Sequence, residues 1–260
     1  MEKQEKNPIT FDHPMAVLSD IHGNRSALEA VLNDIRRRGI TRIVNLGDCL
    51  YGPLDPVGTA EILIRLNIPT VRGNEDRIII QSTEECDFSP SLRFVRESLG
   101  PSHLEWLESL PETAVVDEEF FLCHGTPERD NEYLLREVRD SGVFIRNTEE
   151  LSARLAAYPR QVFLCGHDHV PCSVYLQGGR LIVNPGSVGL PAYTDHLPFP
   201  HAMETYTPHA RYSIIHKGAA GFQVEDIAVP YDWQGAAALA LRNGRPDWAE
   251  WLQTGRAGNS

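Results

Sequence analysis

The sequence predicts an α/β fold in which two sheets share one core and helices flank them. In the first third of the 260-residue chain, a short apolar run, a polar motif and a helical pattern alternate, which is typical of parallel strands joined by helical crossovers. In the second half, short strands are joined by hairpin turns instead. A mixture of both patterns fits two sheets better than one open sheet.

The first third contains the clearest alternation. Asn24 is a plausible N-cap, and the apolar positions from Ala27 to Ile35 predict a helix that ends near Gly39. The predicted strands are 15–19, 42–46 and 69–72, and the second predicted helix is 57–66. Because the carboxyl ends of parallel strands meet at one edge of a sheet, functional groups are expected there.

The second half predicts more hairpins than crossovers. Two glycine pairs or glycine-rich turns, near Gly178 and Gly218, separate apolar runs that should pair antiparallel. The predicted elements are helical stretches in 91–110, strands 113–116 and 120–123, a helix 151–157, a strand 161–165, a hairpin of 173–177 with 180–184, and a hairpin of 211–216 with 222–229.

The chain divides into a central domain with two tails. We expect an N-terminal tail at 1–14, a central domain at 15–230 and a C-terminal helical tail at 231–260. The C-terminal tail should have one helix at 234–242 and a second with Trp248 and Trp251. Residues 194–209 are rich in Pro and His and too irregular to assign; a lid, a dimer arm and a plain loop are open alternatives.

Composition limits the classes of function. The formal net charge of −12 argues against a protein that coats nucleic acid, because neutralising phosphates needs clustered cations. The five cysteines form no paired spacing, so reduced thiols in the cytoplasm are expected. No apolar run is long enough to span a bilayer, and no membrane association is expected. The oligomeric state is open, with a homo-oligomer as one alternative.

Seven candidate metal ligands lie in five short motifs, each where a strand should end. Four imidazoles, two carboxylates and one amide are too many for one tetrahedral zinc ion and suit two adjacent divalent ions. The motifs are Ser-Asp-Ile-His-Gly-Asn with Asp20 and His22, Asn-Leu-Gly-Asp with Asp48, Arg-Gly-Asn-Glu-Asp with Asn74, Cys-His-Gly-Thr-Pro with His124, and Cys-Gly-His-Asp-His with His167 and His169.

Spacing predicts how these ligands meet. Asp20 and His22 are two residues apart, as are His167 and His169, so each pair should share one side of an extended strand end, with Asp168 pointing away. The carboxylate of Asp48 has two oxygens and can bridge two ions.

These motifs, in this order, resemble the calcineurin-like metallophosphoesterase superfamily. The variants of the Ser-Asp-Ile-His-Gly-Asn and Arg-Gly-Asn-Glu-Asp motifs, together with Asn-Pro-Gly-Ser at 184–187, are similar to its small bacterial and archaeal branch of predicted phosphodiesterases. The likeness covers residues 15 to about 193. It implies a four-layer α-β-β-α sandwich of two mixed sheets flanked by helices.

The resemblance also implies a ligand assignment. It gives one metal to Asp20, His22 and His169, the other to Asn74, His124 and His167, and makes Asp48 the bridge. Hydrolysis would then proceed by in-line attack of a metal-bridging hydroxide on phosphorus, with the ions about 3.5–4 Å apart. Manganese is the expected metal, with iron, nickel, zinc and magnesium as alternatives.

Glu75 departs from the superfamily pattern, in which many members have histidine after the motif asparagine. An ionised carboxylate there would repel a doubly charged monoester, which favours phosphodiesters as substrates. Glu75 is therefore a candidate modulator of catalysis. The expected substrate is a small phosphoester or a nucleotide-like molecule. The alternatives are a phosphomonoesterase, a nucleotide polyphosphate hydrolase, or a non-catalytic scaffold of the same fold.

Three further residues are candidates for contact with the substrate, each with a structural alternative. Asn24 can bind phosphate or only cap its helix, and Ser187 can reach phosphate or only brace the ligand loops. Arg77 can bind an anion or pair with Asp76. The histidines of the irregular segment, His196, His201 and His209, lack the spacing of a metal site and are expected on a loop or lid.

Overall fold

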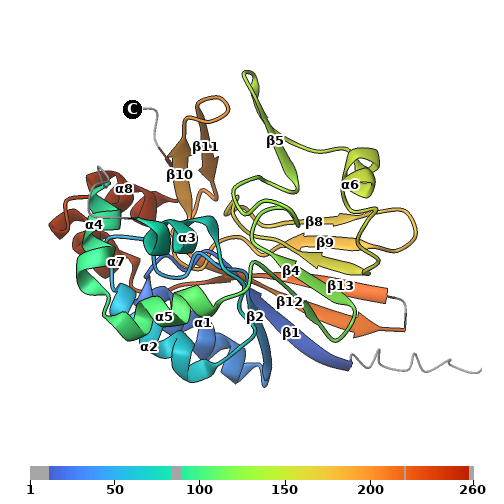
Figure 1. The fold of residues 1–260 in the computed structure, drawn as a ribbon, viewed down its shortest axis with the longest axis horizontal. Helices are drawn as coiled ribbons and strands as arrows, with labels where there is room; N and C mark the ends of the chain where they lie inside the picture. The colour runs from blue at the N-terminus through green and yellow to red at the C-terminus, as the bar shows by residue number, and fades with distance from the viewer. Residues whose placement is uncertain (1–11, 83–88, 220, 258–260) are drawn as a thin grey trace, which may run out of the picture.

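The computed structural model describes residues 12–82, 89–219 and 221–257, and Figure 1 shows two mixed sheets with helices on both sides. The first sheet has the strand order β13-β12-β1-β2, in which only β1 and β2 run parallel. Its strands are β1 (Asp12–Leu18), β2 (Arg42–Asn45), β12 (Ala210–Gly218) and β13 (Gly221–Val229).

The second sheet has the strand order β3-β4-β7-β9-β8. β4, β7 and β9 run parallel, and the outer strands β3 and β8 pair antiparallel with their neighbours. Its strands are β3 (Thr113–Val116), β4 (Phe120–Cys123), β7 (Val162–Leu164), β8 (Cys172–Tyr175) and β9 (Leu181–Asn184). Both hairpins that the glycine turns predicted are present, as β8–β9 and β12–β13.

Alternation along the strands produces the layers. Met15 and Val17 of β1 pack with Leu122 and Leu164 of the second sheet, whereas Ala16 faces the helices on the other side. The period of two in a strand therefore divides the apolar side chains between an inter-sheet core and a helix-facing core. The predicted four-layer sandwich of two mixed sheets is confirmed.

Helices cover the outer faces of both sheets. One group lies on the first sheet and α6 on the second, as Figure 1 shows. The helices are α1 (Arg25–Arg37), α2 (Pro56–Leu66), α3 (Asn74–Gln81), α4 (Pro90–Ser98), α5 (Pro101–Ser109), α6 (Thr148–Arg154), α7 (Trp233–Arg242) and α8 (Pro246–Thr254). None of the helices in the described ranges combines the length and apolar character needed to cross a bilayer.

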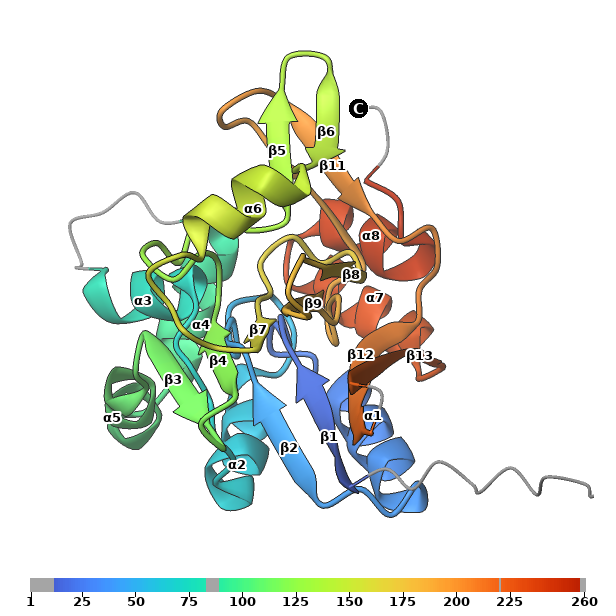
Figure 2. The same cartoon turned by 90° about the vertical axis from the view of Figure 1, so that its right-hand side faces the viewer.

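Three segments differ from the expectation. Residues 69–72 do not form a strand but a single parallel bridge from Thr70 to Asn45, because the backbone of Arg72 bonds instead to Pro111. The irregular segment 194–209 contains most of a hairpin of β10 (Ala192–Asp195) and β11 (His201–Glu204). An unexpected hairpin of β5 (Arg136–Arg139) and β6 (Gly142–Ile145) projects from the same end of the molecule (Figure 2).

The ends of the chain differ in how much of them is described. Most of the expected N-terminal tail, residues 1–11, lies outside the described residues, and β1 begins at Asp12. At the other end, α7 and α8 pack on each other and bury Trp248 against Leu54 and Leu190. The C-terminal helices thus pack against the segments around Leu54 and Leu190, which follow candidate ligands in the sequence.

Candidate metal centre

The candidate ligands occupy the loops after four parallel strands. Asp20 and His22 follow β1, Asp48 follows β2, His124 follows β4, and His167 with His169 follows β7. Asn74 is the first residue of α3, the helix that follows the Thr70 bridge. Because these strand ends lie at one edge of the two sheets, residues up to 149 positions apart in sequence share one site.

Five of these residues have a left-handed backbone. The φ angles of Asp20, His22, Asp48, His167 and His169 lie between 51° and 71°. A non-glycine residue in this region costs about 1 kcal/mol or more, and such strain collects at functional sites. The backbone at Asp20 and His22 therefore does not continue the extended strand, and the expectation of an extended strand end was wrong, as it was for His167 and His169.

A glycine allows two of the loops to touch. A Cβ atom on Gly73 would lie 2.0 Å from Asp48 Oδ1 and 2.5 Å from the Asp48 backbone nitrogen. The absence of a side chain lets the Glu75 backbone N–H donate to Asp48 Oδ1 at 2.9 Å. The glycine of the Arg-Gly-Asn motif is thus required for packing against the carboxylate loop.

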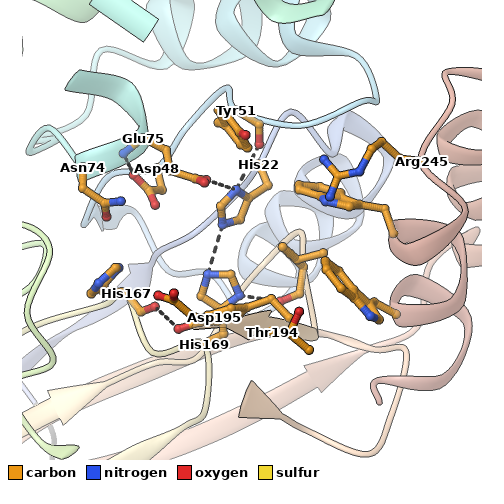
Figure 3. A pocket seen from close by; sticks show the side chains of 14 residues that line it. His22, Asp48, Tyr51, Asn74, Glu75, His167, His169, Thr194, Asp195 and Arg245 are labelled. Atoms are coloured by element: carbon orange, nitrogen blue, oxygen red, sulfur yellow. Dashed lines mark hydrogen bonds and ion pairs between the residues drawn. The ribbon is translucent and has the colours of Figure 1, made fainter. Parts of the chain in front are cut away.

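The ligand atoms form three overlapping groups, each with its atoms within 4.8 Å of one another. Figure 3 shows His22, Asp48, Asn74, His167 and His169 around one space. The groups are Asp20 with His22 and His169, Asp48 with His124 and His167, and His22 with Asp48 and Glu75. The first group has the three residues expected for one ion. The second joins His124 and His167 of the other expected set to Asp48, without Asn74, and the third adds Glu75.

The imidazole rings are oriented by backbone carbonyls. Nδ1 of His22 donates to Tyr51 O, Nδ1 of His124 to Leu46 O, and Nδ1 of His169 to Leu190 O, at 2.7–3.0 Å. A carbonyl can only accept, so the neutral rings carry their lone pairs on Nε2. This arrangement fixes the tautomer of a metal-binding histidine.

The unpaired Nε2 lone pairs of these histidines fit a bound cation. Nε2 of His22 and Nε2 of His169 lie 3.0 Å apart, so a proton or a metal ion must separate their lone pairs. Within the described part of the chain, Asn74 Oδ1 is buried without a hydrogen-bond partner, and His124 Nε2 and Asp20 Oδ1 make ionic contacts only. Buried polar atoms are normally satisfied, so these atoms match the donor set of divalent ions.

Charge coupling within the site is strong. Burial alone would raise the pKa of Asp20 and Asp48, but the neighbouring imidazoles outweigh it and hold both pKa values below the usual range. Burial likewise opposes protonation of His22 and His124, yet Glu75 and Asp48 raise their pKa values to about 9 and about 10. Protons on these two rings therefore balance the carboxylates when no metal does.

Glu75 lies at the wall of the site with about a quarter of its side chain exposed. Its Oε2 is 3.2 Å from His22 Nδ1. Burial, together with the Asp48 carboxylate, raises the pKa of Glu75 to about 7 even though His22 opposes the shift. Glu75 can therefore hold a proton near neutral pH.

The three candidate substrate contacts are occupied by structural bonds. Asn24 caps α1 through the Ala27 N–H and donates to Gly189 O, and Ser187 Oγ donates to Asp20 O; both are buried. Arg77 forms two bonds to Asp130 at 2.6 and 2.9 Å, so the carboxylate that it pairs with is Asp130 and not Asp76, the structural alternative. The geometry thus brings none of the three to the ligand atoms.

Neighbouring side chains brace the histidine loops. Asp168 does point away from the ligands and pairs with Arg136 at 3.1 Å. Tyr193 packs against the His169 ring, with centroids 4.5 Å apart, and donates to His167 O. Its hydroxyl also bonds Tyr133. Tyr193 belongs to β10, the strand that leads into the irregular segment 194–209, so this strand supports the site directly.

A cavity of about 250 Å³ opens onto these ligands. Among the wall residues that the sequence did not indicate as functional are Arg245, Trp248 and Trp251. They belong to α8 and its N-cap, and Arg245 lies across the cavity from Asn74 (Figure 3). They lie in an ordinary helical pattern far from any motif, so no local signal marked them.

Comparison with known proteins places these observations in a family. Residues 14–203 match the model of the calcineurin-like phosphoesterase superfamily domain. Protein MJ0912 of Methanocaldococcus jannaschii is 29% identical over 258 residues, covering 90% of this chain and 94% of that protein.

Two solved structures share the fold over nearly their whole length. A metallophosphoesterase from Sphaerobacter thermophilus has a TM-score of 0.72 at 27% identity, covering 94% of this chain and 99% of its own. Protein PH1004 from Pyrococcus horikoshii has a TM-score of 0.71 at 20% identity, covering 94% and 98%. The motifs, the fold and the family match agree, and the chain belongs to the calcineurin-like phosphoesterase superfamily.

Proposed function

We propose that this protein hydrolyses phosphoric esters with two divalent metal ions, preferably manganese, and that it prefers phosphodiesters. The observation that carries the proposal is the pair of ligand groups that meet at one site, with Asp48 in the second group and within reach of His22 of the first. Such a donor set of imidazole, carboxylate and amide suits adjacent divalent ions.

In this proposal Asp20, His22 and His169 hold one ion, Asn74, His124 and His167 hold the other, and Asp48 binds both. The ions, when bound, would supply an activated water nucleophile and neutralise the charge on the phosphoryl oxygens. The chain itself keeps the rings in the ligating tautomer through the carbonyls of Tyr51, Leu46 and Leu190.

Glu75 is a candidate both for proton donation to the leaving group and for repulsion of negative charge. It faces the same cavity as the ligands, and a pKa of about 7 allows part of the population to hold a proton on the carboxyl group. A protonated Glu75 can donate to the leaving oxygen, and an ionised one repels added negative charge. Bound cations would lower this pKa, which favours the ionised form.

The charges of the cavity wall support a preference for diesters. Asp195 and Glu75 are both in the wall, and among the described lining residues the one arginine or lysine is Arg245. Arg245 is already paired with Asp247 at 2.6 Å. A monoester brings about two negative charges near neutral pH and a diester one, so the diester meets less repulsion.

The test compares bis-p-nitrophenyl phosphate with p-nitrophenyl phosphate on protein loaded with Mn²⁺ near neutral pH. We expect a higher kcat/KM for the diester, and we expect Glu75→Gln to narrow the diester-to-monoester ratio about threefold or more, because the variant removes the charge and keeps the shape. A wild-type preference for the monoester would reject the diester assignment and support a phosphomonoesterase.

A metal analysis separates catalysis from a scaffold role. The intact ligand set predicts about two equivalents of divalent metal per chain and turnover that is lost on chelation and restored by Mn²⁺. Protein that binds no metal and turns over neither ester would support the scaffold alternative.

We further propose a reducing, cytoplasmic location, since the four described cysteines are free thiols.

A further inference from the structure

Helix α8 closes one side of the metal cavity with aromatic side chains. Arg245, Trp248 and Trp251 line the same space as His22 and His169. All three lie beyond residue 203, where the match to the superfamily domain ends. This wall is therefore a feature of the chain outside the matched domain, and its chemistry has to be argued from its own contacts.

Trp248 is a packing residue whose ring is covered by neighbouring side chains and backbone. It is 3% exposed, and the His22 ring meets it edge-on with centroids 5.8 Å apart. The Arg245 guanidinium lies 5.4 Å from the centre of the same ring. The ring also fills the space beside Gly52, where a Cβ atom would come within 2.8 Å of it. Trp248 thus fixes the wall but offers little surface to a ligand.

Trp251 offers more of its surface. It is half-buried, lines the cavity and lies with its centroid 6.4 Å from that of Trp248. Tyr51, also half-buried, and Leu190 line the same cavity, and the Tyr51 hydroxyl is fixed by Ser89. The cavity therefore has a polar end at the ligands and a largely apolar, aromatic end at α8.

The charges at the aromatic end do not select a second phosphate group. Arg245 uses Nε and both terminal nitrogens on Asp247 and Ser91. Its charge is thereby countered by a carboxylate on its own helix. Asp195 at the rim adds a negative charge. A flat, uncharged ring fits this end better than a phosphate does.

We propose that Trp251 and Tyr51 form an aromatic subsite that binds the ring of an aryl or nucleoside ester whose phosphoryl group lies at the metal ligands. The inference rests on the proposed function, because it uses the phosphoryl position as an anchor. Stacking of a base or aryl ring on an aromatic side chain strengthens binding roughly 5- to 100-fold.

The test measures the affinity of two small anions for the Mn²⁺-loaded protein by calorimetry. O-Methyl phenylphosphonate and O-methyl methylphosphonate carry the same single charge, and only the first has a ring, so leaving-group effects do not enter. We expect the phenyl compound to bind wild-type protein about tenfold more tightly. The ratio should fall to about threefold or less in Trp251→Leu and persist in Trp251→Phe.

Trp233→Leu is the matched control, because Trp233 begins α7 in the same tail and does not line this cavity. It should keep the wild-type ratio. Equal affinities of the two compounds for wild-type protein would overturn the subsite, and that comparison stands even if Trp251→Leu does not fold. An unchanged ratio in folded Trp251→Leu would also overturn it. If neither compound binds in a metal-dependent way, the proposed function fails instead.

Discussion

The ligand loops and helix α8 line the same cavity but are built in opposite ways. The loops put five non-glycine residues into left-handed conformations and bury polar atoms such as Asn74 Oδ1 without a partner. Helix α8 is a regular segment with proline in its first turn and a glycine C-cap, and its tryptophans pack in an ordinary apolar cluster. One wall is strained and polar, and the other is relaxed and apolar.

The difference indicates which wall tolerates change. A ligand loop depends on close approach of several backbones, as at Gly73 and Asp48, so a displacement of 1 Å affects every ligand. The α8 wall contributes surface and charge without touching the candidate ligand atoms except at the Trp248–His22 ring contact. We therefore expect large losses of rate from the loops and small changes of selectivity from α8.

The largest effect should come from Asp48→Asn. The variant removes a carboxylate that contacts His124 at 3.2 Å and that we assign to both ions, so we expect kcat/KM for bis-p-nitrophenyl phosphate to fall more than about 10³-fold. His22→Ala should cost less, because the other group stays intact. Near-normal turnover of Asp48→Asn at full metal content would contradict the central place of this carboxylate.

Gly73→Ala tests the strain of the loops without changing a ligand. Its Cβ atom would collide with Asp48, so we expect kcat/KM to fall about 10²-fold and metal occupancy to drop. Gly100→Ala is the control, because the nearest atom to its Cβ lies 3.9 Å away and its φ is −85°. Equal behaviour of the two variants would show that the loop approach is not critical.

Metal affinity should depend on pH in a way that the α8 wall cannot produce. His22 and His124 have raised pKa values of about 9 and about 10, so an entering ion must displace their protons. Affinity for Mn²⁺ should therefore rise with pH, by up to about tenfold per pH unit for each proton displaced, through the neutral range.

Calorimetry in two buffers of different ionisation enthalpy measures both the affinity and the protons released. Histidines with ordinary pKa values near 6.5 would give an affinity that levels off above about pH 7. If the affinity for Mn²⁺ stayed constant above neutral pH and no protons were released, the charge coupling that we assign to the ligand loops would be contradicted.

The smallest effect should come from Asp247→Asn on α8. The change removes the counter-charge of Arg245 and should improve kcat/KM for the monoester about two- to threefold relative to the diester, because the monoester carries the larger charge. Asp232→Asn, an N-cap replaced by another capping residue away from Arg245, should leave the ratio unchanged. An identical ratio in both variants would mean that Arg245 does not act on the substrate.

Much of the fold follows from local patterns. Two short apolar runs on either side of the acidic turn 117–119 predicted β3 and β4 with their observed bounds, and the helical period with the Asn24 cap predicted α1. Residues 69–72 were wrong because a strand needs a partner along its length, and Arg72 bonds to Pro111 instead. The β5–β6 hairpin was missed because two of its strand residues, Phe144 and Ile145, are exposed and give no buried period.

Local sequence patterns are enough to predict the candidate ligands and the sheets that carry them, since motif spacing and strand period are properties of short segments. They do not determine the conformation at the ligands, because a left-handed turn at Asp20 or His167 is favourable only when neighbouring loops hold it. Nor do they reveal Trp251 or Arg245 in the cavity wall. Their position depends on how α8 packs against Leu54 and Leu190, and packing between distant segments is decided only in the tertiary structure.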